Sequence, residues 1–574
     1  MSLYTDASLI MYPSGYKEDK IYSLKPTDGS GDLTFTRAST ATRVNADGLI
    51  EKVRTNLVIN SVWDGVGTNI APTSWGIGFT SGNFEAATNT EDAFSSAIRF
   101  FGTAARRYIT QSSPVGTYIA SFYVNAATTG LRIDNVVTSL SGSSISFLED
   151  GLSISATKII EAGKWYSIIF TNASISEFRI GGGVGSNGTY DFTISMPQWE
   201  TGDVRTEYIP TTTTAVSVGM LADVPRIDYT GGNCGKLLLE PQRTNLVTYS
   251  SEFDNANWAK SGVDATANNT TSPDGTTNAD KLANQLGTTG YLSQTISLSS
   301  STIYTTSVFA KNAGIDNLFI YLSGSGGNAN CTFNLTTLST TPSAGVTAKI
   351  EDYGNGWYRC SATFTASSTG ASGFRIYPSF TTGDGTSGVY LYGAQAESGS
   401  YSTSYIPCPS SSSVTRLADS ASKSGISSLI NSAEGVLYLE TNTFENGGAS
   451  KRISLSDGNA NEYNRLTLEF DESANTLKVF MTSGGNLSAL MTATGIDQSV
   501  NNKIALKYNA TSVDLYVNGV LKQTAATSAS TPIALSVLKF SEPSNNHYFY
   551  GKVKNLIVFP SALSDTDLAT LTTL

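Results

Sequence analysis

Histidine and charged side chains are the residues that this sequence has least of. Its 574 residues include one histidine, His547, and only 14% are Asp, Glu, Lys or Arg, against roughly 25% in a typical globular protein. A Ser-His-Asp or Cys-His hydrolase would have to use His547 as its base. The surrounding sequence NNHYFYGKV places His547 where an apolar strand begins, which argues against catalysis.

Clusters of basic residues are also lacking. The net charge is -11, and no Lys/Arg patch is present that would attract nucleic acid or anionic lipid. No apolar run reaches the 18 residues that a membrane helix needs, and the first 20 residues lack the basic start and apolar core of a signal peptide. We therefore expect a soluble, unprocessed protein with no nucleic-acid partner and no membrane insertion.

Cysteine is scarce, and its spacing does not fit a zinc site. Cys234, Cys331, Cys360 and Cys408 form no C-x-x-C pair. Cys331 and Cys360 could bridge neighbouring strands, but buried free thiols are commoner in a chain made under reducing conditions. The sequence leaves the redox state of this pair open.

Residues typical of turns and strands dominate instead. Gly, Ser, Thr and Asn are abundant, with 28 Tyr and 24 Phe, and short alternating strands recur every eight to twelve residues. This pattern predicts an all-β fold of sandwiches or jelly rolls. Helical periodicity is confined to two segments, 422–435 and 564–574.

The phrase RTNLV occurs twice, at residues 54–58 and 243–247, and the similarity extends on both sides. Upstream, FTRASTATRVNADGLIEKVRTNL aligns without gaps with VPRIDYTGGNCGKLLLEPQRTNL, and each segment has the pattern of a hairpin. Downstream, both copies close with Tyr-Ile-Pro, at residues 208–210 and 405–407. The sequence thus predicts two copies of a hairpin followed by a β-module.

These repeats divide the chain into six predicted parts. They are a segment at 1–36, a hairpin at 37–53, jelly-roll module 1 at 54–215, a linker hairpin at 216–242, jelly-roll module 2 at 243–415 and a third antiparallel sandwich at 416–574. In the third sandwich, YVNGVL contains the Asn-Gly of a tight type I′ hairpin.

The repeated phrases predict joints between modules. The first and last segments of a jelly roll can lie side by side, so the phrases RTNL and YIP can seal a shared edge. We expect the side-chain amides of Asn56 and Asn245 to satisfy backbone groups there, with Tyr208 and Tyr405 in the same junction. Such joints would let modules be strung in series.

Several stretches resemble known families. KIALKYNATSVDLYVNGVLKQT followed by FYGKVKNLIVFPSALSDTDLATL resembles the concanavalin A-like, laminin G-like family over roughly residues 430–574. The duplicated module, with NLVTYSSEFDNANWAKSG and STIYTTSVFAKNAG, looks like the jelly rolls of carbohydrate-binding modules. These resemblances imply sugar-binding β-sandwiches.

The whole chain, from FTRASTATRVNADGLIEKVRTNL through the second hairpin to YIP and SVTRLADSASKSGISSLINSAEGVLYLE, resembles a family of virion proteins of tailed bacteriophages. The resemblance implies a head or tail fibre made in the host bacterial cytoplasm, located in the virion and adhesive toward host-surface glycans. It also implies a homo-oligomer, with trimers common, attached to capsid or tail proteins. Segment 1–36 is too apolar for a solvated tail, so we expect it to order against a partner as the virion anchor.

Two kinds of binding residue are candidates. Trp63, Trp75, Tyr377 and Tyr463 are less tied to the repeated framework than the other aromatic residues and could stack on sugar rings. The sequences SPDGTTNAD, with Asp274 and Asp280, and SDGNANE, with Asp457 and Asn459, have oxygen ligands suited to structural calcium. Plain Asp-Gly turns explain these sequences more often than calcium does. We expect no other cofactor.

No complete catalytic set is found, so we expect no enzyme. The glucanases that share the concanavalin A-like fold carry E-x-D-x-x-E, and LEFDESAN supplies Glu469 and Asp471, but Ala474 stands in the third place. Two alternatives to a structural fibre stay open. One is a tailspike-like depolymerase that uses two carboxylates, and the other is a bacterial surface or secreted lectin-like adhesin.

Overall fold

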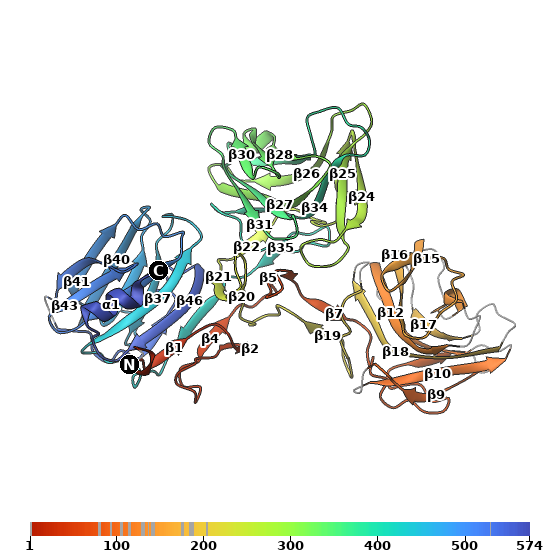
Figure 1. Ribbon diagram of the computed structural model, residues 1–574, viewed down its shortest axis with the longest axis horizontal. Coiled ribbons are helices and arrows are strands. Elements are labelled where there is room, and N and C mark those ends of the chain that lie inside the picture. Colours follow the sequence, from red (N-terminus) through yellow and green to blue (C-terminus); the bar gives the residue numbers. More distant parts are fainter. Residues whose placement is uncertain are drawn as a thin grey trace. The chain divides into compact units, whose positions relative to one another are not determined.

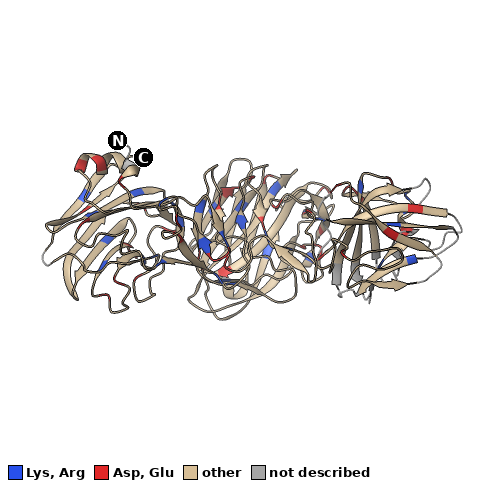
Figure 2. Cartoon of the chain, turned by 90° about the horizontal axis from the view of Figure 1, so that it is seen from below, with Lys and Arg blue, Asp and Glu red and all other residues tan. Residues whose placement is uncertain are grey.

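The computed structural model describes residues 3–78, 82–91, 95–103, 107–112, 116–127, 132–135, 137–138, 144–173, 177–182, 189–201, 205–527 and 530–574. The described chain divides into two compact units. One unit is residues 53–219, and the other combines residues 1–52 with residues 220–574. Nearly every element is a strand (Figure 1), so the predicted all-β sandwich architecture is confirmed. Lys, Arg, Asp and Glu are spread thinly over these strands (Figure 2).

Helical structure is minor. Among the described residues it comprises the α-helix α1 (Asp565–Thr572) and three short 3-10 helices, η1 (Leu3–Thr5), η2 (Ile133–Asn135) and η3 (Gly324–Gly326). None of these described helices has the length and apolarity needed to cross a membrane. The helix expected at 422–435 is wrong: this segment forms the end of a strand followed by turns, and Gly425 adopts a left-handed φ of 72° that interrupts any helix.

Unit 53–219 contains module 1, a sandwich of antiparallel sheets. Its strands are β7 (Arg54–Asn56), β8 (Gly76–Gly78), β9 (Asn83–Thr88), β10 (Ser96–Thr103), β11 (Arg107–Ser112), β12 (Gly116–Ala127), β13 (Val137–Thr138), β14 (Ser144–Glu149), β15 (Leu152–Ile154), β16 (Lys164–Ala173), β17 (Glu177–Gly182), β18 (Thr189–Thr201) and β19 (Val216–Val218). The order is β15-β14-β16-β12-β18-β10-β9 in one sheet and β13-β17-β11-β8 in the other. The first and last strands, β7 and β19, pair separately.

Module 2 belongs to the other unit and repeats this plan. Its strands are β22 (Arg243–Asn245), β23 (Ala259–Ser261), β24 (Val263–Thr270), β25 (Ala279–Asn284), β26 (Tyr291–Leu298), β27 (Ile303–Ala313), β28 (Asn317–Leu322), β29 (Ala329–Asn334), β30 (Ser339–Pro342), β31 (Thr347–Asp352), β32 (Tyr358–Thr365), β33 (Gly370–Tyr377), β34 (Gly388–Ser398) and β35 (Val414–Arg416). The two six-stranded sheets have the orders β23-β26-β33-β28-β29-β30 and β24-β25-β34-β27-β32-β31. Strand β27 lies between β32 and β34 as β12 lies between β16 and β18, and β22 pairs with β35 as β7 pairs with β19.

Most of the remaining strands form a third sandwich, here called the C-terminal sandwich. They are β1 (Leu9–Met11), β2 (Tyr16–Lys17), β3 (Lys20–Ile21), β4 (Leu33–Thr36), β20 (Ile227–Asp228), β21 (Lys236–Leu239), β36 (Ser420–Lys423), β37 (Gly435–Thr443), β38 (Lys451–Ser456), β39 (Arg465–Phe470), β40 (Thr476–Ser483), β41 (Asn486–Thr494), β42 (Asn502–Tyr508), β43 (Ser512–Val517), β44 (Val520–Ala526), β45 (Val537–Lys539) and β46 (Gly551–Phe559). One sheet runs β20-β21-β46-β37-β42-β43-β44 with β1 also on β46, and the other runs β2-β3-β4-β36-β45-β38-β39-β40-β41.

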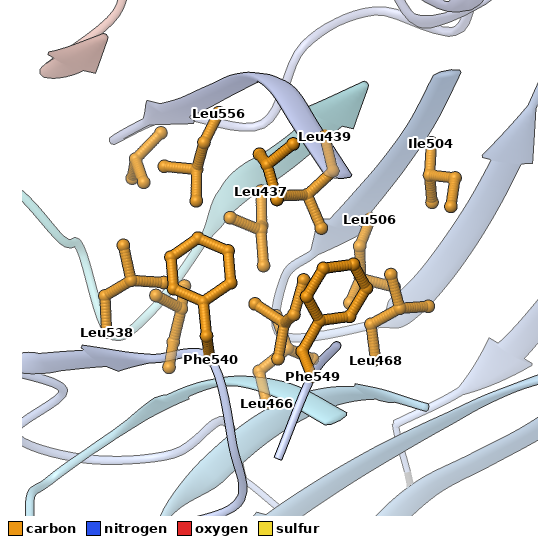
Figure 3. Packing of buried hydrophobic residues seen from close by; sticks show 14 of the residues in the cluster. Leu437, Leu439, Leu466, Leu468, Ile504, Leu506, Leu538, Phe540, Phe549 and Leu556 are labelled. Carbon is orange, nitrogen blue, oxygen red and sulfur yellow. The ribbon is translucent and has the colours of Figure 1, made fainter. Parts of the chain in front are cut away.

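The core of the C-terminal sandwich follows from the alternation of its strands. Figure 3 shows leucines of both sheets facing one another, among them Leu437 and Leu556 from one sheet and Leu466 from the other, with Phe540 and Phe549 between them. All five are at most 2% exposed. The predicted Asn-Gly turn is present between β43 and β44, where both of its residues have positive φ, as a type I′ hairpin requires.

Two predicted boundaries are corrected by this sandwich. Segment 1–36 is part of it, since β1 pairs with β46 and β4 pairs with β36, and Figure 1 shows β1 beside β46. Leu9, Met11 and Phe35 are fully buried in its core. The predicted linker hairpin 216–242 contains β20 and β21, and β21 pairs with β46. The sequence predicted the hairpin that contains β20 and β21 but no strand within segment 1–36. It could not show their partner strands, which come from the far end of the chain.

The hairpin predicted at 37–53 is present and packs within the same unit. Its strands β5 (Arg43–Val44) and β6 (Ile50–Glu51) pair with each other. Val44 and Ile50 are buried with Trp357 and Tyr405 of module 2. The Val44 carbonyl accepts a hydrogen bond of 3.0 Å from Tyr229 N. The first hairpin therefore joins module 2 to the C-terminal sandwich.

Candidate functional site

The outer face of one module 2 sheet carries a group of aromatic side chains. Strand alternation turns Leu292, Ile320 and Ile376 into the core, so the residues between them point outward. Here the term aromatic face denotes these outward rings together with the ring of the following loop. Its members are Tyr291, Phe319, Tyr321, Tyr377 and Phe380.

The rings of the aromatic face contact one another across strands. Phe319 lies opposite Tyr377 in the register of β28 and β33, with ring centroids 5.5 Å apart. Phe380 lies 4.4 Å from Phe319 and 5.3 Å from Tyr377, and Tyr291 lies 5.0 Å from Tyr377. The Phe380 side chain is 58% exposed. A contiguous group of rings with a solvent-facing member is typical of a binding surface.

Arg375 occupies the same outward face two residues before Tyr377. Its guanidinium lies 4.7 Å from the Tyr291 ring centroid and 5.7 Å from that of Tyr321. The Tyr321 hydroxyl donates a 2.6 Å hydrogen bond to Asn328 Oδ1. Donors and acceptors therefore lie beside the aromatic rings, as they do in sites that bind polar ligands with apolar faces.

The four residues predicted to stack on sugar rings lie in three different places in the structure. Tyr377 belongs to the aromatic face. Tyr463 is 53% exposed on a loop of the C-terminal sandwich, near Gly485, as a separate ring. The prediction is wrong for Trp63 and Trp75. The two residues are 0% and 7% exposed, and their rings form an edge-to-face pair in the core of module 1. Their rings cannot stack on a ligand.

The sequence interpretation missed four members of the aromatic face. Tyr291 comes from β26, Phe319 and Tyr321 come from β28, and Phe380 comes from a loop. Nothing in the linear order shows that these residues adjoin. A signal was available, because Phe319 and Tyr321 alternate with core residues Leu318 and Ile320. Outward aromatic residues on a strand are the pattern that identifies such a face.

The two aspartates of SPDGTTNAD accept hydrogen bonds from groups of the protein. Asp274 accepts hydrogen bonds from Lys52 Nζ at 2.7 Å and from the Tyr392 hydroxyl at 3.0 Å. Asp280 accepts from the backbone N–H groups of Phe253 and Asn268, at 2.7 Å and 2.9 Å. Burial raises the pKa of Asp280 to about 7. These donors occupy the oxygens that a cation would need.

The second predicted calcium sequence is also a turn. Asp457 accepts from the Asn459 backbone N–H at 2.9 Å and from Asn464 Nδ2 at 3.0 Å, and Asn459 is exposed. Within the described ranges, no group of three or more His, Cys, Asp or Glu residues is arranged to hold a metal ion. Asp274 and Asp457 therefore accept backbone N–H groups within turns, whereas Asp280 lies on strand β25.

Asn56 and Asn245 occupy matching buried positions in the two modules. Asn245 Nδ2 donates to the carbonyls of Ala394 and Ile406 at 3.1 Å and 2.9 Å, and its Oδ1 accepts from the N–H groups of Val247 and Ala396 at 3.0 Å and 3.1 Å. These bonds tie the start of module 2 to strand β34 and to the YIP segment.

The bonds of Asn56 in module 1 are equivalent. It donates to the carbonyls of Pro197 and Ile209 at 3.3 Å and 2.8 Å and accepts from the N–H groups of Val58 and Trp199, each at 3.0 Å. Both asparagines are 0% exposed. Their amides use the full donor and acceptor capacity of the side chain.

The two tyrosines of the YIP phrases also occupy equivalent positions. The Tyr208 hydroxyl lies 2.8 Å from Ser61 Oγ, and the Tyr405 hydroxyl lies 2.6 Å from Ser250 Oγ. Ser61 and Ser250 are themselves related by the repeat. In each module the serine Oγ also accepts a backbone N–H from the residues that follow YIP, so each junction is closed by the same side-chain network.

A buried charge network lies where the hairpins meet module 2. Arg226 pairs with Glu240 at 2.6 Å and with Asp419, Arg416 pairs with Glu240 at 2.7 Å, and Arg37 pairs with Asp419 at 3.2 Å. Burial alone would raise the pKa of Glu240, but Arg416 and Arg226 outweigh it and hold this pKa well below its usual range. Because removing one partner leaves a buried charge uncompensated, such a network stabilises one arrangement of its segments.

The carboxylates considered for catalysis are engaged in ion pairs. Glu469 is 3% exposed and pairs with Arg452, while Asp471 pairs with Lys478. His547 Nδ1 lies 3.1 Å from Glu542 Oε1. Cys331 and Cys360 are free thiols, and burial raises the pKa of Cys331 to about 11. A free thiol with a raised pKa is a poor nucleophile.

Comparison with known proteins identifies the class of the C-terminal sandwich. A family model described as the concanavalin A-like lectin/glucanases superfamily matches residues 441–569. The predicted concanavalin A-like, laminin G-like domain at the C-terminus is therefore confirmed. No curated protein matches the chain.

Three solved structures are similar to this chain at low identity. The CBM40 domain of the Ruminococcus gnavus IT-sialidase bound to α2,3 sialyllactose has 18% identity and a TM-score of 0.23, and covers 25% of this chain and 84% of its own. The same domain bound to α2,6 sialyllactose has 18% identity and a TM-score of 0.22, and the match covers 25% of this chain and 84% of that domain. The LG1-3 region of the laminin α2 chain has 9% identity and a TM-score of 0.17, covering 98% of this chain and 97% of its own.

Proposed function

We propose that this protein is a non-catalytic glycan-binding protein that holds its ligand on the aromatic face of module 2. The observation that carries the proposal is the exposed Phe380 ring packed on Phe319 and Tyr377. Sugar rings present apolar C–H faces edged by hydroxyl groups. An aromatic ring can cover the apolar face while neighbouring polar groups bind the hydroxyls.

The C-terminal sandwich supports the same class of function. Its superfamily includes lectins and glucanases, and the lectin alternative fits the ion pairs of this chain. Glu469 and Asp471 are tied to Arg452 and Lys478, so neither carboxylate is poised to protonate a glycosidic oxygen. Reducing ends released from a host polysaccharide by the purified protein would instead identify a depolymerase.

The binding test uses one variant and one matched control. Phe380→Ala removes the exposed ring, and we expect it to weaken binding of glycans selected on an array by about tenfold. Ile303→Ala is the control because Ile303 is an exposed apolar residue, 44% accessible, on the other sheet of module 2. Equal glycan affinities of the wild-type protein, Phe380→Ala and Ile303→Ala would count against the proposal. Failure of the wild-type protein to bind any glycan would also count against it.

The finer proposal places the protein in a virion as a homotrimeric head or tail fibre that attaches to host glycans. It is supported by the full-length resemblance to phage fibre proteins and by the repeated joints, which suit modules strung in series. Edge strands β41 and β44 expose Leu490 and Val520, 49% and 53% accessible, and assembly would cover such edges.

The location and the assembly can be measured directly. We expect mass spectrometry to find the chain in purified phage particles, together with capsid or tail proteins, and sedimentation equilibrium of the purified protein to give a trimer. A chain that is absent from particles but present on bacterial cells or in the medium would favour the adhesin alternative. A monomer would remove the oligomeric part of the proposal.

A further inference from the structure

The sheet that carries the aromatic face has no acidic residue in any of its six strands. Strands β23, β26, β28, β29, β30 and β33 contain neither Asp nor Glu, although the chain has 47 acidic residues and a net charge of -11. The charged residues in these strands are Lys260 and Arg375. The Lys260 ammonium donates to backbone carbonyls near the edge strand, the nearest being Asp254 O at 2.8 Å.

Arg375 is a cation without a counter-charge on this face. No ion pair among the described residues involves Arg375, and its Nε is buried without a hydrogen-bond partner. An arginine in the seven-stranded sheet of module 1 is different: Arg99 on β10 pairs with Asp191 at 2.6 Å and with Glu85 at 2.9 Å. The fold can thus supply two carboxylates to a sheet arginine but supplies none to Arg375.

The rings around Arg375 fix its orientation. Tyr291 and Tyr321, on the strands that flank β33, lie 4.7 Å and 5.7 Å from its guanidinium. A guanidinium held between aromatic rings keeps its charge and loses little freedom when its planar fork accepts a two-oxygen anion. Carboxylate and sulfate are the anionic groups of glycans that fit this fork.

The arginine is aligned with the part of the aromatic face that is open to solvent. Arg375 and Tyr377 are two residues apart on β33 and point to the same side, so their Cα atoms are about 7 Å apart. That spacing lets one sugar ring cover Tyr377 and Phe380 while an acidic substituent, or the next residue of the chain, reaches Arg375.

Module 1 contains the same tyrosine–arginine pair in a different setting. Arg179 lies 4.9 Å from the Tyr108 ring centroid, and both positions correspond by register to Arg375 and Tyr291. Gly181 stands where module 2 has Tyr377. The full combination of arginine and stacking ring is therefore assembled in module 2.

Resting on the proposed glycan-binding function, we infer that the aromatic face selects acidic glycans, and that Arg375 binds their carboxylate or sulfate group. Because no ion pair in the described part of the chain joins Arg375 to a carboxylate, its guanidinium is available to a ligand anion. A neutral glycan would stack on the rings but leave this charge without a partner.

The test compares oligosaccharides that differ only in the acidic group. The probes are an oligogalacturonide, the same oligosaccharide after reduction of its carboxyl groups to hydroxymethyl groups, and a sulfated galactan oligosaccharide of similar length. By calorimetric titration of the full-length protein we expect the acidic probes to bind at least about tenfold more tightly than the reduced one. A preference between the two acidic probes distinguishes carboxylate from sulfate.

Variants assign the effect to Arg375. Arg375→Gln should lose the preference for acidic probes and keep the weak affinity for the reduced probe, while Arg375→Lys should retain part of the preference because it keeps the charge but not the planar fork. Lys349→Gln is the control, since it makes the same charge change at an exposed position on the other sheet of module 2. Unchanged thermal melting of each variant shows that folding is intact.

The outcomes separate this inference from the function on which it rests. Equal binding of the acidic and reduced oligosaccharides, or equal losses in Arg375→Gln and Lys349→Gln, would overturn selection by Arg375 and leave glycan binding standing. Binding of no glycan by the wild-type protein would remove both. Loss of the acidic preference in Arg375→Gln alone supports the inference.

Discussion

Asn245 shows how much one side chain contributes to the joint of a module. Its amide bonds to four backbone groups, two on strand β34, one in the YIP segment and one at Val247, just after strand β22. None of these groups can turn to water, because the asparagine is completely buried. An aspartate, a leucine or an alanine at this position would leave at least two of them without a partner.

We therefore expect Asn245→Ala to destabilise module 2 by roughly 3 kcal/mol, since each unsatisfied buried group costs about 1 to 3 kcal/mol and water can enter part of the space. Calorimetric unfolding of the full chain measures the change. Asn269→Ala is the control, because Asn269 is exposed on β24. Identical melting of both variants would mean that the repeated asparagine has no structural role.

Glu240 makes the buried charge network sensitive to acid. Its folded-state pKa is held below the ordinary value of about 4.3, so its contribution to stability is complete above that pH and is lost as the pH falls through the folded-state value. The free-energy gap between the wild-type protein and Glu240→Gln should thus be widest near pH 7 and narrow below about pH 4. Urea unfolding of both proteins across this pH range measures the difference in unfolding free energy. A difference that does not change with pH would contradict the role given to the Glu240 carboxylate.

At the scale of the element, strand β1 belongs to the C-terminal sandwich. Leu9 and Met11 are fully buried against residues of β46 and β37, whereas Leu24, in the same N-terminal segment, is 53% exposed. Leu9 is therefore a core residue and Leu24 a surface residue, although both lie in the same short N-terminal segment.

We expect Leu9→Ala to lower the unfolding free energy of the C-terminal sandwich by about 2 to 5 kcal/mol, as core leucine truncations do. Leu24→Ala should change it by less than about 0.5 kcal/mol. Denaturant unfolding of the two variants makes the comparison. If Leu9→Ala behaved like Leu24→Ala, the N-terminal strand would not be part of the sandwich.

At the scale of the molecule, module 1 is an insertion in the sequence of the other unit. The chain leaves that unit after residue 52 and returns at residue 220, close to where the Ala41 N–H donates to Met220 O at 2.9 Å. Each sheet lies wholly within one unit. The unit that combines residues 1–52 and 220–574 thus contains complete cores of its own.

Replacing residues 53–219 by a flexible Gly/Ser linker should leave the rest of the protein folded, with the calorimetric transitions of module 2 and the C-terminal sandwich unchanged. The excised residues 53–219 should show a single transition of their own, because their core is separate. Aggregation of the shortened chain, with loss of its transitions, would show that the other unit depends on module 1 to fold.

The sequence by itself determined the local structure and its repetition. Alternating residues predicted the sandwiches, the Asn-Gly pair predicted the β43–β44 turn, and the repeated phrase led to Asn56 and Asn245. These conclusions depend on neighbours in the chain or on comparing two copies, and both are visible in a linear sequence.

Only the tertiary structure decided which distant segments share a core or a surface. β1 pairs with β46 across almost the whole chain, and Trp63 is enclosed while Phe380 is open, yet their local sequences do not distinguish a buried ring from an exposed one. The strand period fixes only the side to which each side chain points. Whether that side faces a core, solvent or an unpaired arginine depends on how the sheets pair and pack, because burial is a property of the assembled layers.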